Sequence, residues 1–76
     1  MNSAKYIIFD DRVAVVFSAT QSHAEIARAL NMRPTSAGFC AVDDAGSVAA
    51  WGSSFTLGIS SDPGDTDHLR RLLKPY

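Results

Sequence analysis

Two short stretches of the chain combine the residue types that a small-ligand site requires. The stretches 35–39 (Thr-Ser-Ala-Gly-Phe) and 51–54 (Trp-Gly-Ser-Ser) each contain a glycine, hydroxyl side chains and an aromatic ring. Glycine lets the backbone approach a ligand closely, hydroxyls exchange hydrogen bonds, and an aromatic ring offers a stacking surface. If the stretches meet in the fold, they form the rim of a ligand site with the candidates Ser36, Phe39, Trp51 and Ser53. Turn formation and a packed tryptophan explain the same stretches without a ligand.

The other reactive residue types favour structural roles over catalysis. His23 has no acid or nucleophile that the sequence places beside it, so we predict a histidine that packs against or caps a helix. Cys40 lies inside a predicted strand, whereas a reactive thiol favours a helix N-terminus or cationic neighbours, and we predict a small core residue. The aspartate pairs 10–11 and 43–44 have the chemistry to bind a hard cation, but aspartates in turns usually bond their own backbone. One cysteine and two histidines cannot supply the four ligands of a structural zinc site. The residues also assemble no set of nucleophile, base and orienting group, no metal cluster and no phosphate-binding loop, so we predict no metal site, no cofactor and no catalytic residue.

Short runs of β-branched and aromatic residues, bounded by acidic or glycine-containing turns, predict the strands that position these residues. Five strands are expected, at 6–9, 12–17, 37–42, 47–51 and 55–59. The acidic break between the first two runs predicts a β-hairpin with a two-residue turn.

Two helices are expected between and after these strands. Ser22 and Glu25 have the spacing of a capping box, which predicts a helix over 22–32. Asp62 suits the N-cap of a second helix, which Pro75 ends. The buried stripe of that second helix is predicted to consist of leucines: Leu69, Leu72 and Leu73.

The elements follow one another as β-β-α-β-β-β-α, which predicts a single α+β domain over residues 1–76. We expect a mostly antiparallel sheet with the two short helices packed on one face. The stretches 6–30 and 49–73 share the plan of two strands and a helix, which is compatible with a ββα duplication. The sequence leaves that question open, because few of the aligned residues are identical.

The predicted sheet is apolar on both faces, and two short helices cover about one face of such a sheet. Large apolar patches usually mark interaction sites, so we expect the second face to contact another chain, in a homodimer or with a host protein. A one-residue slip in register would exchange the two faces. The alternative is that the sheet coils and the strand over 55–59 closes over the second face. With the two-residue turn, the candidate partner-binding face consists of Ile7, Phe9, Arg12, Ala14 and Val16.

Composition excludes several classes of function. The formal net charge is −1 and 20% of the residues are charged, so the chain lacks the basic footprint of a nucleic-acid-binding protein. The longest strongly apolar run spans 13–17, far short of the ~20 residues of a transmembrane helix. A single cysteine cannot form a disulfide within the monomer and suits a reducing compartment. We therefore expect a cytoplasmic protein with neither a nucleic acid nor a membrane as its partner.

Several strings carry a resemblance when they are taken together. They are 6–9 (Tyr-Ile-Ile-Phe), 14–18 (Ala-Val-Val-Phe-Ser), His23, 34–40 (Pro-Thr-Ser-Ala-Gly-Phe-Cys), 51–54 and 57–59 (Leu-Gly-Ile). The set resembles a group of small accessory proteins encoded by bacterial phages and prophages, for which no catalytic residues are established. The resemblance implies a non-enzymatic binding protein in the cytosol of a bacterial host, such as an inhibitor of a defence system like CRISPR. The alternative is a protein that binds a small ligand and sequesters a nucleotide.

Overall fold

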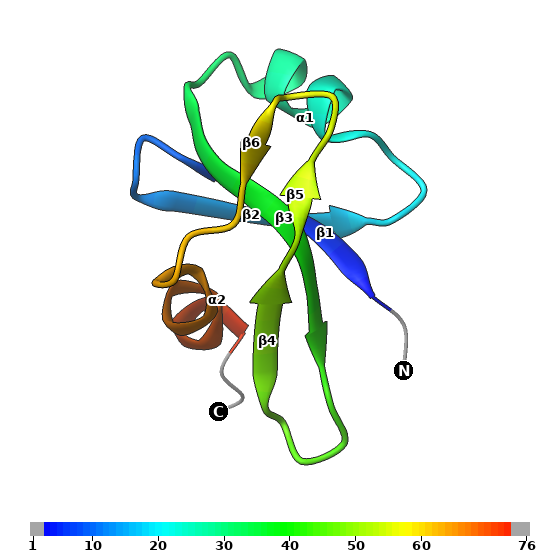
Figure 1. The fold of residues 1–76 in the computed structure, drawn as a ribbon, viewed down its shortest axis with the longest axis vertical. Helices are drawn as coiled ribbons and strands as arrows, with labels where there is room; N and C mark the ends of the chain where they lie inside the picture. The colour runs from blue at the N-terminus through cyan, green and yellow to red at the C-terminus, as the bar shows by residue number, and fades with distance from the viewer. Residues whose placement is uncertain (1–2, 74–76) are drawn as a thin grey trace.

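The computed structural model describes residues 3–73 and is built around a four-stranded antiparallel sheet (Figure 1). The strands lie in the order β2-β1-β3-β4, with the bounds β1 Ala4–Phe9, β2 Val13–Ser18, β3 Pro34–Val42 and β4 Val48–Trp51. A separate hairpin is formed by β5 Ser53–Ser54 and β6 Ile59–Ser60. The two helices are α1 His23–Leu30 and α2 Asp65–Leu73. Within this described part of the chain, neither helix has the length and apolar character needed to cross a membrane.

The α+β class, the antiparallel sheet and the predicted order of elements are confirmed when the hairpin is taken as the fifth β element. The single strand predicted over 55–59 is wrong, because the chain reverses direction over 55–58. Gly58 has a φ of 70°, which favours glycine, and its N–H donates to the carbonyl of Ser54 at 2.9 Å. Of the alternating apolar residues in this stretch, Leu57 and Ile59 pack against the core, whereas Phe55 is exposed at the turn.

The two ββα stretches of the sequence do not share a pairing pattern. In the first stretch, β1 and β2 pair with each other. In the second stretch, β4 pairs with β3, while β5 pairs with β6. The strand pairing therefore gives no support to a duplication.

The hairpin between β1 and β2 is offset by one residue from the predicted register. Asp10 and Asp11 have φ values of 54° and 56°, the left-handed conformation that aspartate tolerates in hairpin turns. The N–H of Arg12 donates to the carbonyl of Phe9 at 2.9 Å, and this bond closes the turn. The ladder then places Phe9 opposite Val13 and leaves Arg12 outside it. Because side chains alternate along a strand, the slip moves every β2 side chain to the opposite face.

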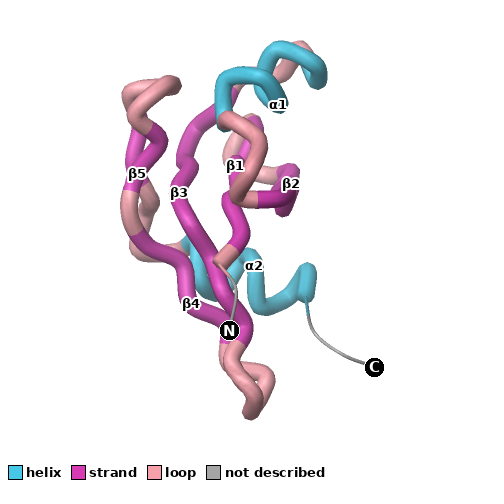
Figure 2. The backbone as a smooth tube through the Cα atoms, turned by 90° about the vertical axis from the view of Figure 1, so that its right-hand side faces the viewer, coloured by secondary structure: helices cyan, strands magenta, loops and turns pink. Residues whose placement is uncertain are grey.

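Alternate side chains of β1 build a hydrophobic core on each face of the sheet. On one face, Tyr6 and Ile8 pack with Leu69 of α2. On the other face, Ile7 and Phe9 pack with apolar side chains of α1 and the hairpin, namely Ile26, Ala27, Leu57 and Ile59. The helices therefore lie on opposite faces, with the sheet between them (Figure 1 and Figure 2), and not on one face as predicted. A sheet that is apolar on both faces buries more surface when each face has its own cover.

The start of α1 confirms the predicted capping box. The hydroxyl of Ser22 accepts from the N–H of Glu25 at 3.1 Å, and the carboxylate of Glu25 accepts from the N–H of Ser22 at 3.1 Å. The bond from the Ser22 backbone is the main reason that the pKa of Glu25 lies below its usual range. The helix ends at Leu30, earlier than predicted, because Asn31 takes the left-handed conformation with a φ of 51°.

The start of α2 differs from the prediction. The helix begins at Asp65 instead of following Asp62 directly, because the N–H of Asp65 donates to the carbonyl of Asp62 in a preceding turn at 3.0 Å. Leu72, predicted as part of the buried stripe, is 53% exposed. The predicted helix end at Pro75 lies outside the described residues.

Candidate functional site

The predicted partner-binding face is not an exposed surface. Ile7 and Phe9 are each 0% exposed beneath α1 and the hairpin. Ala14 and Val16 belong to the opposite face, where they pack against the core under α2. Arg12 lies in the turn, outside the ladder. The prediction fails because of the register slip and because the chain covers the face itself, with α1 and the segment that follows β4.

The predicted ligand rim is brought together in part. Phe39 on β3 and Trp51 on β4 lie opposite each other, and their rings stack with centroids 6.4 Å apart and planes 26° apart. Ser36 is 2% exposed on the other face, where its hydroxyl donates to Asp65 at 3.0 Å. Ser53 is exposed in β5. The two stretches therefore meet through their aromatic rings, while the hydroxyl of Ser36 does not face the rim.

Two glycines permit this meeting of the stretches. A Cβ atom on Gly38 would lie 2.4 Å from the carbonyl oxygen of Trp51, a separation that real Cβ contacts essentially never show. Gly52 has a φ of 83°, and a Cβ atom there would lie 3.1 Å from the ring of Phe39. The two dipeptides that look distinctive in the sequence, Gly38-Phe39 and Trp51-Gly52, thus owe their composition to the close packing of neighbouring strands.

The stacked pair continues into a row of four rings. His23, at the start of α1, lies edge-on between Phe17 and Phe39, with centroid separations of 5.4 Å and 6.1 Å. His23 is 4% exposed, and its Nε2 lies 2.9 Å from the carbonyl oxygen of Gly38. Because a carbonyl only accepts, Nε2 carries the proton in this bond. We refer to Phe17, His23, Phe39 and Trp51 as the aromatic row, in which His23 has the predicted packing role.

Two large aromatic side chains are exposed, one at the end of β4 and one directly after β5. Trp51 is 43% exposed, and Phe55, four residues further along the chain, is 96% exposed. The turn that presents Phe55 is closed by the buried residue Ser54, whose hydroxyl accepts from the N–H of Leu57 at 3.2 Å and whose carbonyl accepts from Gly58. We refer to Trp51 and Phe55 as the exposed aromatic pair. The strand predicted over 55–59 did not single out Phe55, because it placed Phe55 on the same face as Leu57 and Ile59. The glycine at 58 was the available signal of a turn.

A buried polar network under α2 was also missed by the sequence prediction. Asp65 is 4% exposed, and its Oδ2 accepts from the hydroxyl of Tyr6 at 2.5 Å and from the N–H of Asp62 at 2.9 Å. Its Oδ1 accepts from the hydroxyl of Ser36. Burial, followed by the bond to Asp65, raises the pKa of Tyr6 far above its usual range. The network joins α2 to β1 and β3, and among the described residues no buried side-chain nitrogen or oxygen lacks a partner.

Two further residue types take the structural roles predicted for them. Cys40 is 2% exposed in the core under α2, and burial raises the pKa of its thiol. Asp43 bonds its own turn, since its Oδ1 accepts from the N–H groups of Ala45 and Ser47 at 2.9 Å and 2.8 Å. Over residues 3–73, no three side chains of His, Cys, Asp or Glu gather in a way that would hold a metal ion.

The described residues thus combine a fully partnered polar core with two aromatic side chains that face solvent. Exposed aromatic groups on a rigid scaffold suit recognition by contact. No family model, no curated protein and no solved structure matches this chain.

Proposed function

We propose that this protein is a non-enzymatic binding protein that acts through protein–protein contacts and uses the exposed aromatic pair as its recognition surface. The observation that carries the proposal is the 96% exposure of Phe55 on a turn that hydrogen bonds hold closed. Burial of a phenylalanine side chain is worth about 1.5–3 kcal/mol, and a partner that covers Phe55 gains this energy.

Trp51 adds to this surface in a way that favours binding. Its ring stacks on Phe39, which in turn contacts His23, so the side chain is held in place before a partner arrives. A preformed side chain loses less conformational entropy on binding, and tryptophan is enriched among the residues that dominate interface energies.

The resemblance to phage-encoded accessory proteins names the partner to test first. On that basis, the partner is a complex of a bacterial defence system, such as a CRISPR effector, in the cytoplasm of a bacterial host. A homodimer through the same aromatic pair is the other form of this proposal, and light scattering distinguishes the two.

Affinity capture with point variants tests the proposal. We would immobilise the full chain, apply bacterial lysate and quantify the captured proteins by mass spectrometry. Residues that dominate an interface cost about 2 kcal/mol or more when truncated, so Trp51→Ser and Phe55→Ser should each reduce capture of the true partner about 30-fold. Leu30→Ser is the matched control, because Leu30 is also an exposed apolar residue, at 42%, but lies on α1.

The result that rejects the proposal is a captured set that responds to neither aromatic substitution while light scattering shows a monomer. A partner lost equally with Leu30→Ser would point to general loss of folding, which circular dichroism of each variant checks. A partner retained by the control and lost with both aromatic variants supports the proposal.

A small planar ligand is the second candidate, and the stack of Phe39 on Trp51 favours it. A nucleotide base would stack on the exposed face of Trp51, since base–aromatic stacking is worth about 1–3 kcal/mol per base. Trp51 is the sole tryptophan of the chain, so its fluorescence reports on such a ligand directly. A ligand at 100 times its Kd should also add about 2.7 kcal/mol of stability. If a broad nucleotide panel produces no quenching and no thermal shift, this candidate is rejected.

A further inference from the structure

The two edges of the sheet differ in how their backbone groups are protected. The edge strand β4 has four residues, and the N–H of Ala50 donates to the hydroxyl of Thr66 on α2 at 3.1 Å. The other edge strand, β2, has six residues (Val-Ala-Val-Val-Phe-Ser) and pairs with β1 without a register shift. Within the described part of the chain, no backbone group of 13–17 forms a hydrogen bond outside its pairing with β1.

Natural sheets usually protect such an edge with a charged side chain, a proline or a bulge, because a bare edge pairs readily with another strand. The β2 strand has none of these three devices. A long, regular and unprotected edge is the geometry that accepts an extended peptide as an additional strand.

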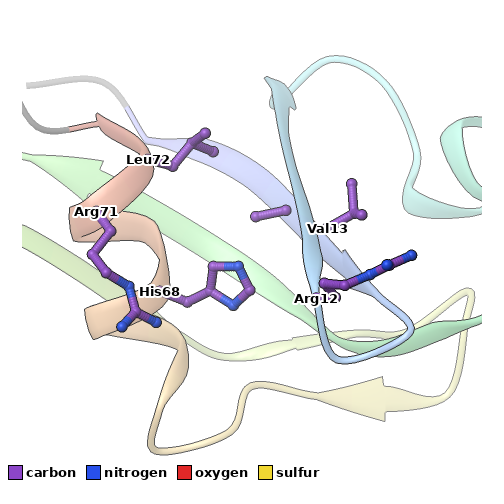
Figure 3. A pocket seen from close by; sticks show the side chains of 6 residues that line it. Arg12, Val13, His68, Arg71 and Leu72 are labelled. Carbon is purple, nitrogen blue, oxygen red and sulfur yellow. The ribbon is translucent and has the colours of Figure 1, made fainter.

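A cavity of about 480 Å³ lies beside this edge, between the start of β2 and α2. It is lined by Arg12, Val13, Ala14, His68, Arg71 and Leu72. In Figure 3, His68 and Leu72 project from α2 toward the β1–β2 hairpin, while the side chain of Arg12 extends away from the helix. Val13 and Leu72 are 36% and 53% exposed, so the cavity presents apolar surface to solvent, which favours burial by a partner.

Both charged residues among those that line the cavity are arginines, Arg12 and Arg71. Among the described residues, Arg33 and Arg70 each have a carboxylate within 4 Å, from Asp10 and Asp67, whereas neither Arg12 nor Arg71 has one. Guanidinium groups bind carboxylates through paired hydrogen bonds, which favours an acidic ligand at this place. A second copy of β2 offers no carboxylate, since the strand contains no acidic residue.

We propose that β2 and the adjoining cavity bind an extended, acidic segment of a partner protein by strand addition. The backbone of the segment pairs with the open edge of β2, and an apolar side chain covers Val13 and Leu72. Its carboxylates meet Arg12 and Arg71. The surface is separate from the exposed aromatic pair, so this inference goes beyond the proposed function and stands or falls independently of it.

Fluorescence anisotropy with a labelled eight-residue peptide of alternating glutamate and valine tests this inference on the full chain. We expect saturable binding that is at least about tenfold weaker, or about 1.4 kcal/mol, for the matching peptide of lysine and valine. The same loss is expected when alternate backbone nitrogens of the acidic peptide are methylated, because methylation removes the donors that strand addition requires. Higher salt should also weaken binding.

Substitutions on the protein locate the site. Arg12→Glu and Arg71→Glu should each weaken binding of the acidic peptide about tenfold or more, and both residues are exposed, so the fold should persist. Arg28→Glu is the matched control, since Arg28 is an exposed arginine on α1, on the other face of the sheet. Trp51→Ser should leave peptide binding unchanged, which separates this site from the aromatic surface.

Three results would each overturn the inference. The first is no saturable binding of the acidic peptide, or equal binding of the lysine peptide. The second is equal binding of the methylated peptide, which would show that no strand is added. The third is a dimer in light scattering that persists in Trp51→Ser and Phe55→Ser and that the acidic peptide does not dissociate, which would show that a second copy occupies the edge.

Discussion

Replacement of Asp65 by alanine should be one of the most destabilising single changes in this protein. The substitution leaves the hydroxyls of Tyr6 and Ser36 without their acceptor, and all three residues are at most 4% exposed. An unsatisfied buried donor costs about 1–3 kcal/mol, so two of them predict a loss of about 2–6 kcal/mol. A chain of this length has a total stability of about 4–11 kcal/mol, so the loss is a large fraction of it.

Urea denaturation followed by far-ultraviolet circular dichroism gives the free energy of unfolding for each variant. The corresponding fall in Tm should be at least about 8 °C for a domain of this size. Asp67→Ala is the matched control, because Asp67 also lies in the first turn of α2 but is exposed and pairs with Arg70. That control removes only the interaction with the helix dipole and a surface ion pair, which predicts a cost of at most about 1 kcal/mol.

A double-mutant cycle tests whether the network acts as a unit. Tyr6→Phe alone should cost about 1–2 kcal/mol, since Asp65 keeps its bonds from Ser36 and from the backbone of Asp62. The double variant should cost at least about 0.5 kcal/mol less than the two single costs combined. A cost for Asp65→Ala no larger than that of Asp67→Ala, or strictly additive costs in the cycle, would refute the reasoning.

Two further predictions follow from single contacts. Gly38→Ala should destabilise the protein by more than about 2 kcal/mol in the same urea assay, because the added Cβ meets the backbone of Trp51. Gly64→Ala is the control and should stay within about 0.5 kcal/mol of the wild type, because no atom lies within 4 Å of its added Cβ. The free energy of unfolding should fall as the pH rises above about 10, because the unfolded chain releases the Tyr6 proton there while the folded state, in which the pKa of Tyr6 is raised, retains it. Tyr6→Phe should remove the contribution of Tyr6 to this fall in the free energy of unfolding. The contribution of Cys40, whose pKa burial also raises, should remain. An unchanged pH profile in Tyr6→Phe would contradict the assignment of the fall to Tyr6.

Local sequence patterns correctly predicted the helix cap and the turn, because their hydrogen bonds connect residues that are close in the sequence. The capping box of Ser22 and Glu25 and the turn of Asp43 are built from groups at most four residues apart, so their geometry is set by short-range sterics. The first four strands were located for a similar reason, since β-branched and aromatic runs report on the strand itself.

The sequence predicted a contact of the candidate site only where each of the two contacting residues stood in a distinctive stretch of the chain. Phe39 and Trp51 were chosen separately for their glycine and hydroxyl neighbours, and the structure brings their rings together. Ser36 was chosen on the same grounds, but the side-chain alternation of β3 turns it to the opposite face, toward Asp65. Phe55 was missed because the same alternation of apolar residues fits a strand and a turn that lies against a core.

The sequence by itself determined the class of the fold, the order of its elements and the need for cover on both faces of the sheet. Only the tertiary structure decided which segments provide that cover and which β2 side chains face which core. A register shift of one residue changes no local propensity, yet it exchanges the faces of a strand. The choice therefore rests on contacts between residues far apart in the chain, such as Ile7 with the hairpin and Tyr6 with Asp65, which local sequence patterns do not encode.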